Sequence, residues 1–592
     1  VVGPIIASAL VLLAVFAPTI FLGGMTGIIY SQFGIVLSGA VLVSTLVALT
    51  LTPAMAALLM KHEKKGLIGR TLEGGIAGGI RGFTGVARGL VKVPLSGVIL
   101  LALVCYGIYH FGSRIPTGLI PNEDTSAVFV ASSFQPGTSL AITDQVTRDI
   151  VEELKQIEGV DSVVSAAGVN LLSGGVEMSA NMMLLSLSPM EERELSDDEV
   201  IDLVNEVLGG IEEMEGFAFK PPPIPDLGLV DGVDMVIKDL KGVSPTELAE
   251  VTEEFIDKAN ASEAIAFAST EYRVDKPAIF LDLDRLKSKQ YGVDVDMAVN
   301  ALQSYAGGSF INNFNMAGRN YRVMIQNERA LAKKLEDIAN IELSYRTGVS
   351  FRFGELFKAE RILAPSFITR YNAQQAVSLN VFPTVSTGDA IAALNAIELP
   401  KGFAIEYSGM TRQEVAAGNA AAIAFGMALL ITFLVLVGQY ESWSIPTIIM
   451  LTVPTAIIGI VWGVMALGGN INIMTQIAAI LLVGMCVRNA ILIVEFAKNL
   501  REKDGMSIAD AAVEAVRLRA RAVAMTALSF AMGVVPLMLA SGTGKGGQLA
   551  IGYASFGGIM TATIIGCLLA PVFYVIIQGI RENLAGSSEP AE

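Results

Sequence analysis

The chain alternates between long apolar runs and one long polar stretch. An α-helix needs about 20 apolar residues to cross a bilayer, and eight runs come close to or exceed that length. They lie at about 4–22, 34–60, 95–112, 417–438, 446–468, 473–497, 520–541 and 551–579. Between the third and the fourth run lies a polar block at 114–415. The pattern predicts eight membrane-spanning helices that are interrupted by one large water-exposed domain.

Short runs of alternating apolar residues inside the polar block predict strands, and longer amphipathic runs predict helices. The first half reads as strand 126–134, a helix from PGTS to about 157, strand 160–168, then strand 182–188, helix 197–214 and strand 216–220. The second half repeats the pattern with strand 233–240, helix 244–260, strand 278–284, strand 376–383, helix 387–397 and strand 403–409. Two strand–helix–strand units are the split βαβ pattern of a ferredoxin-like subdomain. We therefore expect a polytopic α-helical membrane protein with a large α+β domain.

Two further segments have distinctive patterns. Segment 307–326, GGSFINNFNMAGRNYRVMIQ, predicts a long hairpin whose turn lies near Ala317 and Gly318. Segment 66–93 spaces its basic residues among glycines and aliphatic residues, which is typical of a helix that lies along a membrane surface. An ordinary loop is the alternative for this second segment.

The composition supports a membrane protein and excludes several other classes. Hydrophobic residues make up 52% and charged residues 17%, with a mean hydropathy of +0.57, whereas about 25% of the residues of soluble domains are charged. The net charge of −16 argues against nucleic-acid binding, which needs basic patches. Cys105, Cys486 and Cys567 all lie in apolar runs and predict buried side chains rather than a disulfide framework. With only His62 and His110, we expect no metal site, catalytic triad or cofactor.

The charges also predict which side of the membrane each loop occupies. The polar block holds 46 of the 57 acidic residues and 25 of the 41 basic residues. Lysine and arginine near helix ends mark the cytoplasmic side, and the short loops of the opposite side carry only Lys545. Fourteen basic residues lie on the first side: Lys61, Lys64, Lys65, Arg70, Arg81, Arg88, Lys92, Lys498, Arg501, Lys503, Arg517, Arg519, Arg521 and Arg581. The polar block is therefore expected on the far side from the cytoplasm.

The first two spans repeat the last two at a fixed offset of 518 residues without a gap. The matching pairs are Ala9 and Ala527, Leu10 and Leu528, Pro18 and Pro536, Gly24 and Gly542, Gly34 and Gly552, Gly39 and Gly557, Thr45 and Thr563, and Pro53 and Pro571. Both copies run in the same direction, which is a parallel repeat of the kind found in transporters. The second copy has six spans and an outer domain, whereas the first has only its last two spans. We therefore expect this chain to be the C-terminal portion of a protein roughly twice as long.

Arg488 stands in the middle of span 473–497. A charge at that depth costs about 2.5 kcal/mol or more, so such residues normally face a bundle interior and an anionic partner. An arginine that extends to the interface is the alternative. The only acid in the eight spans is Glu495, near the cytoplasmic end, so we expect the carboxylate partner of Arg488 in the missing half.

Four segments resemble signatures of the resistance–nodulation–division (RND) efflux permeases, in particular the hydrophobe/amphiphile multidrug exporters. They are FLGGMTGIIYSQFGI (21–35), GQYESWSIP (438–446), VRNAILIVEFAKN (487–499) and RLRARAVAMTALSF (517–530). The resemblance covers essentially the whole chain. It implies a proton-driven antiporter rather than an enzyme, working as a homotrimer in the Gram-negative inner membrane with a large periplasmic domain. It also implies a periplasmic adaptor protein and an outer-membrane channel as partners.

The resemblance also divides the chain into parts. It implies two spans at 1–60, a cytoplasmic loop with a surface helix at 61–93, a span at 94–113, a first porter subdomain at 114–220, a second at 221–285 and 363–415, a docking subdomain at 286–362, five spans at 416–580 and a cytoplasmic tail at 581–592.

The proton site of the RND family pairs two aspartates on the fourth span with a lysine on the tenth. Arg488 occupies the lysine position, and since arginine keeps its proton at any accessible pH, it would act as a switching counter-ion and not as a proton donor. Arg519 and Thr526 match further relay positions, and Asn489 is the neighbour of Arg488. The aspartate pair would precede Val1.

The resemblance implies substrate residues as well. Phe217, Phe219 and Asp226 would line an entrance cleft between the porter subdomains, although the phenylalanines have ordinary strand core as an alternative. A deep pocket would contain Val164, Val169, Leu171 and Leu184, and the loop 168–175 with Gly168, Gly174 and Gly175 would act as a gate. Drug pumps of the family carry phenylalanines in this pocket. Because aliphatic residues lack ring stacking, we expect a preference for aliphatic amphiphiles over planar dyes.

Two alternatives remain open. Met178, Met182 and Met183 would suit a heavy-metal (Cu/Ag) exporter of the same superfamily, since thioethers bind soft Cu(I), although methionine is also common in protein cores. The second alternative is a non-transporting receptor or protein-export factor with the same fold.

Overall fold

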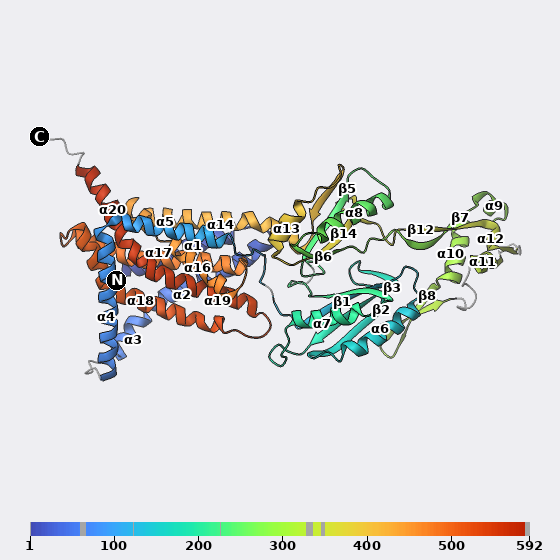
Figure 1. Ribbon diagram of the computed structural model, residues 1–592, viewed down its shortest axis with the longest axis horizontal. Coiled ribbons are helices and arrows are strands. Elements are labelled where there is room, and N and C mark those ends of the chain that lie inside the picture. The colour runs from blue at the N-terminus through green and yellow to red at the C-terminus, as the bar shows by residue number, and fades with distance from the viewer. Residues whose placement is uncertain are drawn as a thin grey trace.

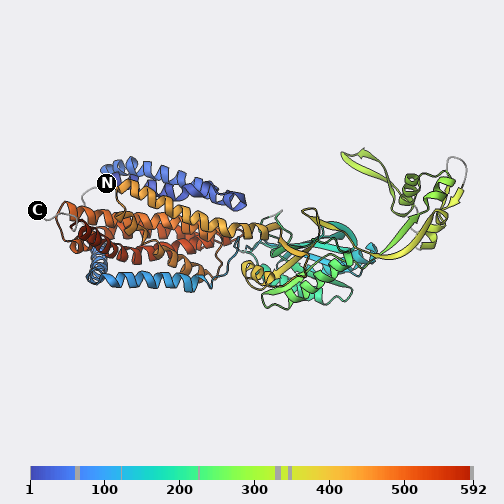
Figure 2. The ribbon, with the colours of Figure 1, turned by 90° about the horizontal axis from the view of Figure 1, so that it is seen from above.

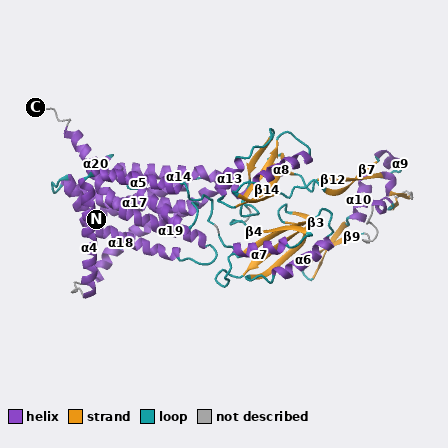
Figure 3. Cartoon of the chain, viewed as in Figure 1, coloured by secondary structure: helices purple, strands orange, loops and turns teal. Residues whose placement is uncertain are grey.

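A computed structural model of the chain describes residues 2–59, 67–121, 123–224, 227–326, 335–344 and 350–586. The molecule is elongated, with a helical bundle at one end, two sheets in the middle and a small distal region at the other end (Figure 1). The strands lie outside the bundle, where shorter helices accompany them (Figure 3). Asp226 lies outside the described residues.

All eight predicted apolar runs are helical. The bundle contains α1 (Val2–Ile20), α2 (Gly24–Leu49), α3 (Leu51–Leu59), α5 (Pro94–Gly112), α14 (Gly409–Tyr440), α15 (Ser444–Met450), α16 (Pro454–Leu467), α17 (Ile473–Glu502), α18 (Ile508–Met538), α19 (Lys545–Thr561), a π-helical turn (Ala562–Gly566) and α20 (Cys567–Gly586). Within the described residues, seven segments are long and apolar enough to cross a membrane, and α1 adds a shorter apolar helix. Several helices extend beyond the apolar runs; α18 begins at Ile508 because the Ser507 side chain caps its first turn.

The two copies of the repeat have matching local geometry. Gly24 and Gly542 both have a positive φ, of 75° and 82°, where the chain passes from the first helix of each pair to the second. The hydroxyl groups of Thr45 and Thr563 each donate to the carbonyl oxygen four residues earlier, at 2.7 Å in both cases. The sequence repeat is therefore also a structural repeat.

The end of the bundle at which α17 ends and α18 begins carries the exposed residues Lys92, Lys503 and Arg517 and is called the basic end below. The helix α4 (Leu67–Lys92) crosses this end at a steep angle to the other helices (Figure 1). A helix therefore occupies the segment for which a loop was the alternative. Of the three cysteines, Cys486 and Cys567 are buried as expected, whereas Cys105 is exposed because it lies on the outer face of α5.

The first sheet domain (127–219) is a four-stranded sheet with two helices. It contains β1 (Ala127–Phe134), α6 (Leu140–Leu154), β2 (Val160–Asn170), β3 (Gly175–Leu187), α7 (Asp197–Gly209) and β4 (Met214–Phe219), with the strand order β2-β3-β1-β4. Buried aliphatic residues of β1, β3, α6 and α7 form its core. Helix α7 ends at Gly209 and not at 214, because a second glycine, Gly210, follows it directly.

The second sheet domain (233–269 and 369–407) also combines a sheet with two helices, but one of its strands differs from the prediction. It contains β5 (Val233–Asp239), α8 (Pro245–Asn260), β6 (Ile265–Ser269), β13 (Thr369–Tyr371), β14 (Gln374–Pro383), α13 (Thr387–Asn395) and β15 (Phe403–Tyr407). The strand that returns to the sheet after α8 is β6, which pairs with β14. The predicted strand 278–284 instead belongs to β7 (Lys276–Leu283), whose one strand partner in the described part of the chain is β12 (Phe357–Ala364).

The β7–β12 ribbon leads to the distal region. This region contains α9 (Arg285–Gln290), α10 (Val295–Ala306), β8 (Ser309–Met316), β9 (Arg319–Ile325), α11 (Leu335–Ala339), β10 (Glu342–Ser344), β11 (Ser350–Arg352) and α12 (Phe353–Leu356). Strands β8 and β9 form the predicted hairpin, with Ala317 and Gly318 at its turn. Nearly every hairpin residue is exposed, and the hairpin extends away from the rest of the region (Figure 2).

Candidate functional site

A cavity of about 1420 Å³ lies between the two sheet domains and continues to the helical bundle. Its upper part is lined by β4 of the first sheet domain and by β6 and β14 of the second. Its lower part reaches the loop between α16 and α17 and the first turns of α19. A molecule at the outer surface of the bundle can therefore reach the space between the sheets.

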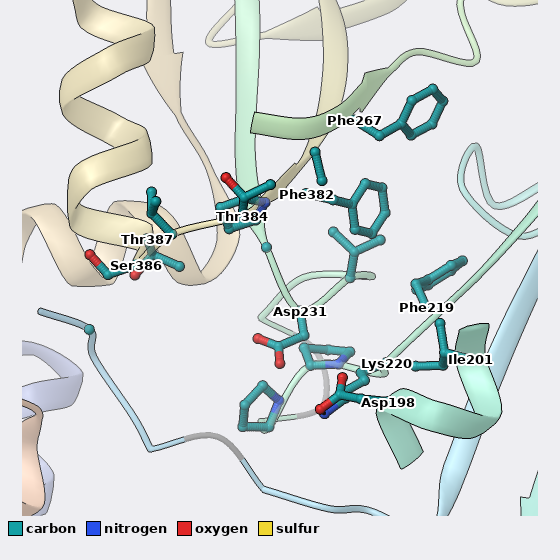
Figure 4. Close-up of a pocket in the computed structure, with 18 of the residues that line it drawn as sticks. Asp198, Ile201, Phe219, Lys220, Asp231, Phe267, Phe382, Thr384, Ser386 and Thr387 are labelled. Carbon is teal, nitrogen blue, oxygen red and sulfur yellow. The ribbon is translucent and has the colours of Figure 1, made fainter. Parts of the chain in front are cut away.

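Phenylalanines form the upper wall of this cavity. Phe217 lies at the centre, with its ring centroid 5.4 Å from those of Phe267 and Phe382 and 5.6 Å from that of Phe219. Phe219 also contacts Phe129, with 6.0 Å between the ring centroids. Edge-to-face and tilted ring pairs at such distances are favourable. Figure 4 shows Phe219, Phe267 and Phe382 on this wall. The aromatic cluster therefore joins the two sheet domains.

Two predicted deep-pocket residues lie in line with this cluster. Phe129 pairs with Phe219 on one side and with Leu184 on the other, and Leu184 pairs with Val164. Directly opposed residues of antiparallel strands point to the same face of a sheet, so these four side chains form one row across the first sheet. Leu171 packs against the aromatic cluster.

The cavity itself is lined by Phe217 and Phe219 but by none of the four predicted deep-pocket residues. Val169 pairs with Val176 near the end of the β2–β3 hairpin and is outside the row. The pattern of alternating residues did not reveal Phe267 and Phe382, because each belongs to a different strand from Phe217 and only the fold brings them together. An aromatic surface therefore lies beside the predicted aliphatic positions, and the preference for aliphatic amphiphiles over planar dyes stays a prediction.

Charged residues form the lower wall of the cavity. The Lys220 ammonium group lies 3.1 Å from the Asp197 carboxylate and 2.9 Å from that of Asp198. Burial raises the pKa of the nearby Asp231 carboxyl, and Lys220 opposes part of that shift. Figure 4 shows Asp198, Lys220 and Asp231 together, on the far side of Phe219 from Phe267. One cavity therefore offers an aromatic surface and a charged surface, as an amphiphilic ligand requires.

The predicted gate loop is shorter than expected. Strand β2 continues to Asn170 and β3 begins at Gly175, so only 171–174 is a turn. Of the three predicted gate glycines, only Gly174 lies in this turn, while Gly168 and Gly175 lie within strands. The strands extend because the pairing of β2 with β3 continues to the end of the hairpin.

The Asn170 side chain holds this turn and ties it to the second sheet domain. Its carbonyl oxygen accepts hydrogen bonds from the backbone N–H groups of Leu172 and Ser173, at 3.1 and 3.0 Å. Its amide nitrogen donates to the carboxylates of Glu177 and Glu271, at 3.1 and 2.7 Å. Burial raises the pKa of Glu271, and the bond from Asn170 opposes this shift. Because Glu271 follows β6, the turn is connected across the cleft between the sheet domains.

We expect Glu271→Ala to speed amide hydrogen exchange in the turn 171–174 about tenfold. A hydrogen bond to a charged group contributes about 1.5–3 kcal/mol, and 1.4 kcal/mol corresponds to a factor of ten. Glu271→Gln keeps an acceptor for Asn170 and should retain most of the protection. Hydrogen–deuterium exchange of the purified variants measures both effects. Equal exchange rates in the wild type and the Ala variant would show that the cross-cleft bond does not restrain the turn.

A buried carboxyl lies where the second sheet domain joins the bundle. The backbone N–H of Asp234, on β5, donates to the Thr411 hydroxyl of α14 at 2.8 Å, and the Ser408 N–H donates to the Asp234 carbonyl oxygen at 3.0 Å. Gly409 has a φ of 52°, and a Cβ there would lie 2.6 Å from the Asp234 carboxylate. Helix α14 thus begins directly at the sheet, and the predicted boundary at 415–416 falls inside a helix.

The carboxyl of Asp234 predicts a pH-dependent stability. Burial raises its pKa to about 7, against a smaller opposing effect of the Met410 backbone N–H. A raised pKa means that the folded protein binds this proton more tightly than the unfolded chain, so the contribution to stability is lost as pH rises from about 4 through 7. We expect Asp234→Asn to raise the Tm at pH 8 by about 3 °C and to have little effect at pH 5. Thermal unfolding at both pH values measures this, and a variant that is equally destabilised at both would contradict it.

Arg488 lies in the middle of α17, where its side chain is half-buried and has no charged partner in the described part of the chain. Glu495 lies about two turns closer to the basic end, near the Tyr440 hydroxyl at the end of α14. Asn489 is 2% exposed, and its amide nitrogen and oxygen both lack hydrogen-bond partners among the described residues. The Arg488 cation and the unsatisfied Asn489 amide are therefore consecutive residues of one helix within the bundle.

The other two predicted relay residues belong to α18. The Arg519 guanidinium carbon lies 3.9 Å from the centre of the Phe496 ring on α17. Since α17 and α18 are antiparallel and both rise about 1.5 Å per residue, Thr526 lies at about the depth of Asn489. The Thr526 hydroxyl donates to the Ala522 carbonyl oxygen at 2.9 Å. Because Phe496 follows Arg488 by eight residues on α17, Arg519 lies about two turns from Arg488 along the bundle. No hydrogen bond directly joins the four predicted relay residues in the described structure.

The methionines do not form the cluster that a heavy-metal exporter would need. Met182 and Met183 are consecutive on β3 and so point to opposite faces of the sheet. Met183 is fully buried in the core of the first sheet domain, whereas Met178 is 62% exposed. These positions favour the core interpretation for Met183.

Comparisons with known proteins identify the family. The chain is 34% identical to the antibiotic efflux pump membrane transporter ArpB of Pseudomonas putida and 33% identical to the toluene efflux pump membrane transporter TtgB of the same species, over 99% of the chain in both cases. It is 30% identical over 97% of its length to the multidrug export protein AcrF of Escherichia coli. The chain spans 57% of the length of each of these relatives. Residues 1–578 match the profile of the AcrB/AcrD/AcrF family, and the chain therefore belongs to this family of RND efflux transporters.

Proposed function

We propose that this chain forms the C-terminal portion of a proton-driven transporter that exports hydrophobic and amphiphilic compounds. The observation that carries the proposal is the cavity between the sheet domains, which combines a phenylalanine wall with a charged wall and opens toward the bundle. Relatives named as toluene and antibiotic efflux pumps support the same class of substrate. The heavy-metal and non-transporting alternatives have no comparable observation in their favour.

The two sheet domains would act as porter subdomains with ferredoxin-like topology. Their paired strand–helix–strand units support this assignment. The distal region would serve as the docking subdomain, and its exposed hairpin is available for contacts with another chain. The whole transporter would be a homotrimer in the Gram-negative inner membrane, with the sheet domains in the periplasm, and would work with an adaptor protein and an outer-membrane channel.

Proton coupling would use Arg488 as a switching counter-ion and not as a proton donor. An arginine remains protonated throughout, so the proton would be carried by carboxylates from the rest of the transporter. Asn489 and Thr526, at a similar depth, would complete the polar path, and Arg519 would continue it toward the basic end. The absence of a charged partner for Arg488 among the described residues supports this division of roles.

The proposal is tested in an efflux-deficient Gram-negative strain that expresses the complete transporter. We expect reduced accumulation of an alkyl detergent and of an aromatic solvent, and we expect an uncoupler of the proton gradient to abolish the reduction. Cells that carry the empty expression vector provide the baseline. Accumulation that is unchanged by expression, or that is insensitive to the uncoupler, would contradict the proposal.

A further inference from the structure

A second cavity lies at the side of the bundle, far from the one between the sheet domains. It has a volume of about 380 Å³ and lies among α4, α17, α18 and the π-helical turn before α20. Helix α4 crosses the basic end beside α18 (Figure 1). The cavity is therefore near the basic end and within the membrane-spanning helices.

This second cavity is an open crevice with an apolar floor, and it is called the crevice below. Ile493, Val516 and Val523 form part of the floor, and each is at most 2% exposed. On the rim, Leu528 is 57% exposed and Ile564 is 51% exposed. Apolar side chains at the surface of a membrane helix face lipid, so the crevice opens sideways to the bilayer.

One cation lines the crevice, and its charge is not neutralised. Arg521 is exposed and has no hydrogen bond or ion pair with any residue that the structure describes. The arginines on either side differ: Arg517 is paired with Glu514 at 2.6 Å, and Arg519 lies over the Phe496 ring. Arg521 is therefore the arginine of this turn that is free to bind an anion.

The crevice runs in the direction of a lipid tail and covers part of its length. From Arg521 to Leu528 the helix rises seven residues, or about 10 Å, away from the basic end. Half of the hydrocarbon core of a bilayer is about 15 Å thick, so the apolar part stays within one leaflet. A charged group at the end of the crevice nearer the basic end and an apolar floor beyond it match the two parts of a phospholipid.

We propose that this crevice binds an anionic phospholipid of the leaflet at the basic end. One acyl chain lies against the apolar floor, and the phosphate of the headgroup binds the Arg521 guanidinium. Basic pockets between membrane helices on the cytoplasmic side are suited to such headgroups. Neither the aromatic cavity nor the Arg488 region takes part, so the site is independent of the proposed export function.

The test is photocrosslinking of the purified protein in nanodiscs that contain equal amounts of phosphatidylglycerol and phosphatidylethanolamine. In each experiment only one of the two lipids carries a photoactivatable group on one acyl chain. The experiment is then repeated with the group on the other lipid. We expect crosslinks to residues 79–83, 524–528 and 563–567, about fivefold stronger from phosphatidylglycerol, because one basic residue near an anionic headgroup contributes about 1 kcal/mol.

Two pairs of matched variants separate the contribution of the Arg521 charge from that of the apolar crevice. Arg521→Gln should remove the preference for phosphatidylglycerol, whereas Arg517→Gln, which affects an arginine already paired with Glu514, should retain it. Ala524→Trp should block the crevice and abolish labelling, whereas Met532→Trp, on an exposed part of α18 outside the crevice, should not. Equal labelling by the two lipids, equal effects of the two glutamine variants, or no labelling because another part of the transporter fills the crevice would each overturn the proposal.

Discussion

Replacing Arg488 with alanine is expected to reduce export by the complete transporter to the background level. The side chain is the positive charge at the centre of α17, and the proposed coupling depends on a carboxylate that responds to this charge. Truncating a half-buried arginine removes a charge that has no partner among the described residues, so the protein should still fold and assemble. Accumulation of a substrate in cells, together with the protein level and a native gel for the trimer, measures both parts.

Arg488→Lys is the informative companion variant. It keeps the positive charge but loses the planar fork of the guanidinium group, so it should retain substantial export if charge is what coupling needs. Arg517→Ala, at an exposed residue on α18, controls for the general effect of losing an arginine. Full export by the alanine variant at position 488 would exclude Arg488 from the coupling mechanism.

The second large effect is expected at Phe219, and it concerns stability. Phe219 is 3% exposed and is packed among Phe129, Phe217 and Phe382. Phe219→Ala should lower the free energy of unfolding by about 3–5 kcal/mol and should reduce the protein level. This is the result that the strand-core alternative predicts for Phe219, whereas a role in the entrance cleft predicts a normal protein level.

Phe217→Ala provides the contrast. The Phe217 ring is half-buried and lines the cavity, so its loss should weaken substrate binding by about 1 kcal/mol, or about fivefold, at a normal protein level. Immunoblots and export assays of the two variants distinguish a core residue from a cleft residue. A normal level of the Phe219→Ala protein together with lost export would assign Phe219 to the cleft instead.

Features set by local chemistry could be predicted from the sequence. The apolar runs predict the membrane helices because a bilayer requires about 20 apolar residues in sequence. The hairpin at 307–326 was predictable because Ala317 and Gly318 interrupt two alternating runs, and both residues adopt a positive φ there. Arg488 was conspicuous because a charge is rare in such a run.

Features set by contacts between distant segments could not be predicted in this way. Strand β6 has only five residues, two of them alanine, so the longer run at 278–284 was the stronger strand signal. Phe267 and Phe382 join Phe217 only after the second sheet has folded. The bond from Asn170 to Glu271 likewise connects residues that are 101 positions apart, which a local pattern cannot reveal.

The placement of the sheet and distal regions between α5 and α14 has a consequence for biosynthesis. The bundle is closed by contacts of α1 with α14 and α17, and of α4 with α18. These partners lie on opposite sides of an insertion of about 300 residues, which a ribosome takes on the order of tens of seconds to synthesise. The faces of α1 and α4 that contact α14, α17 and α18 therefore stay without these partners in the bilayer until the insertion has been synthesised.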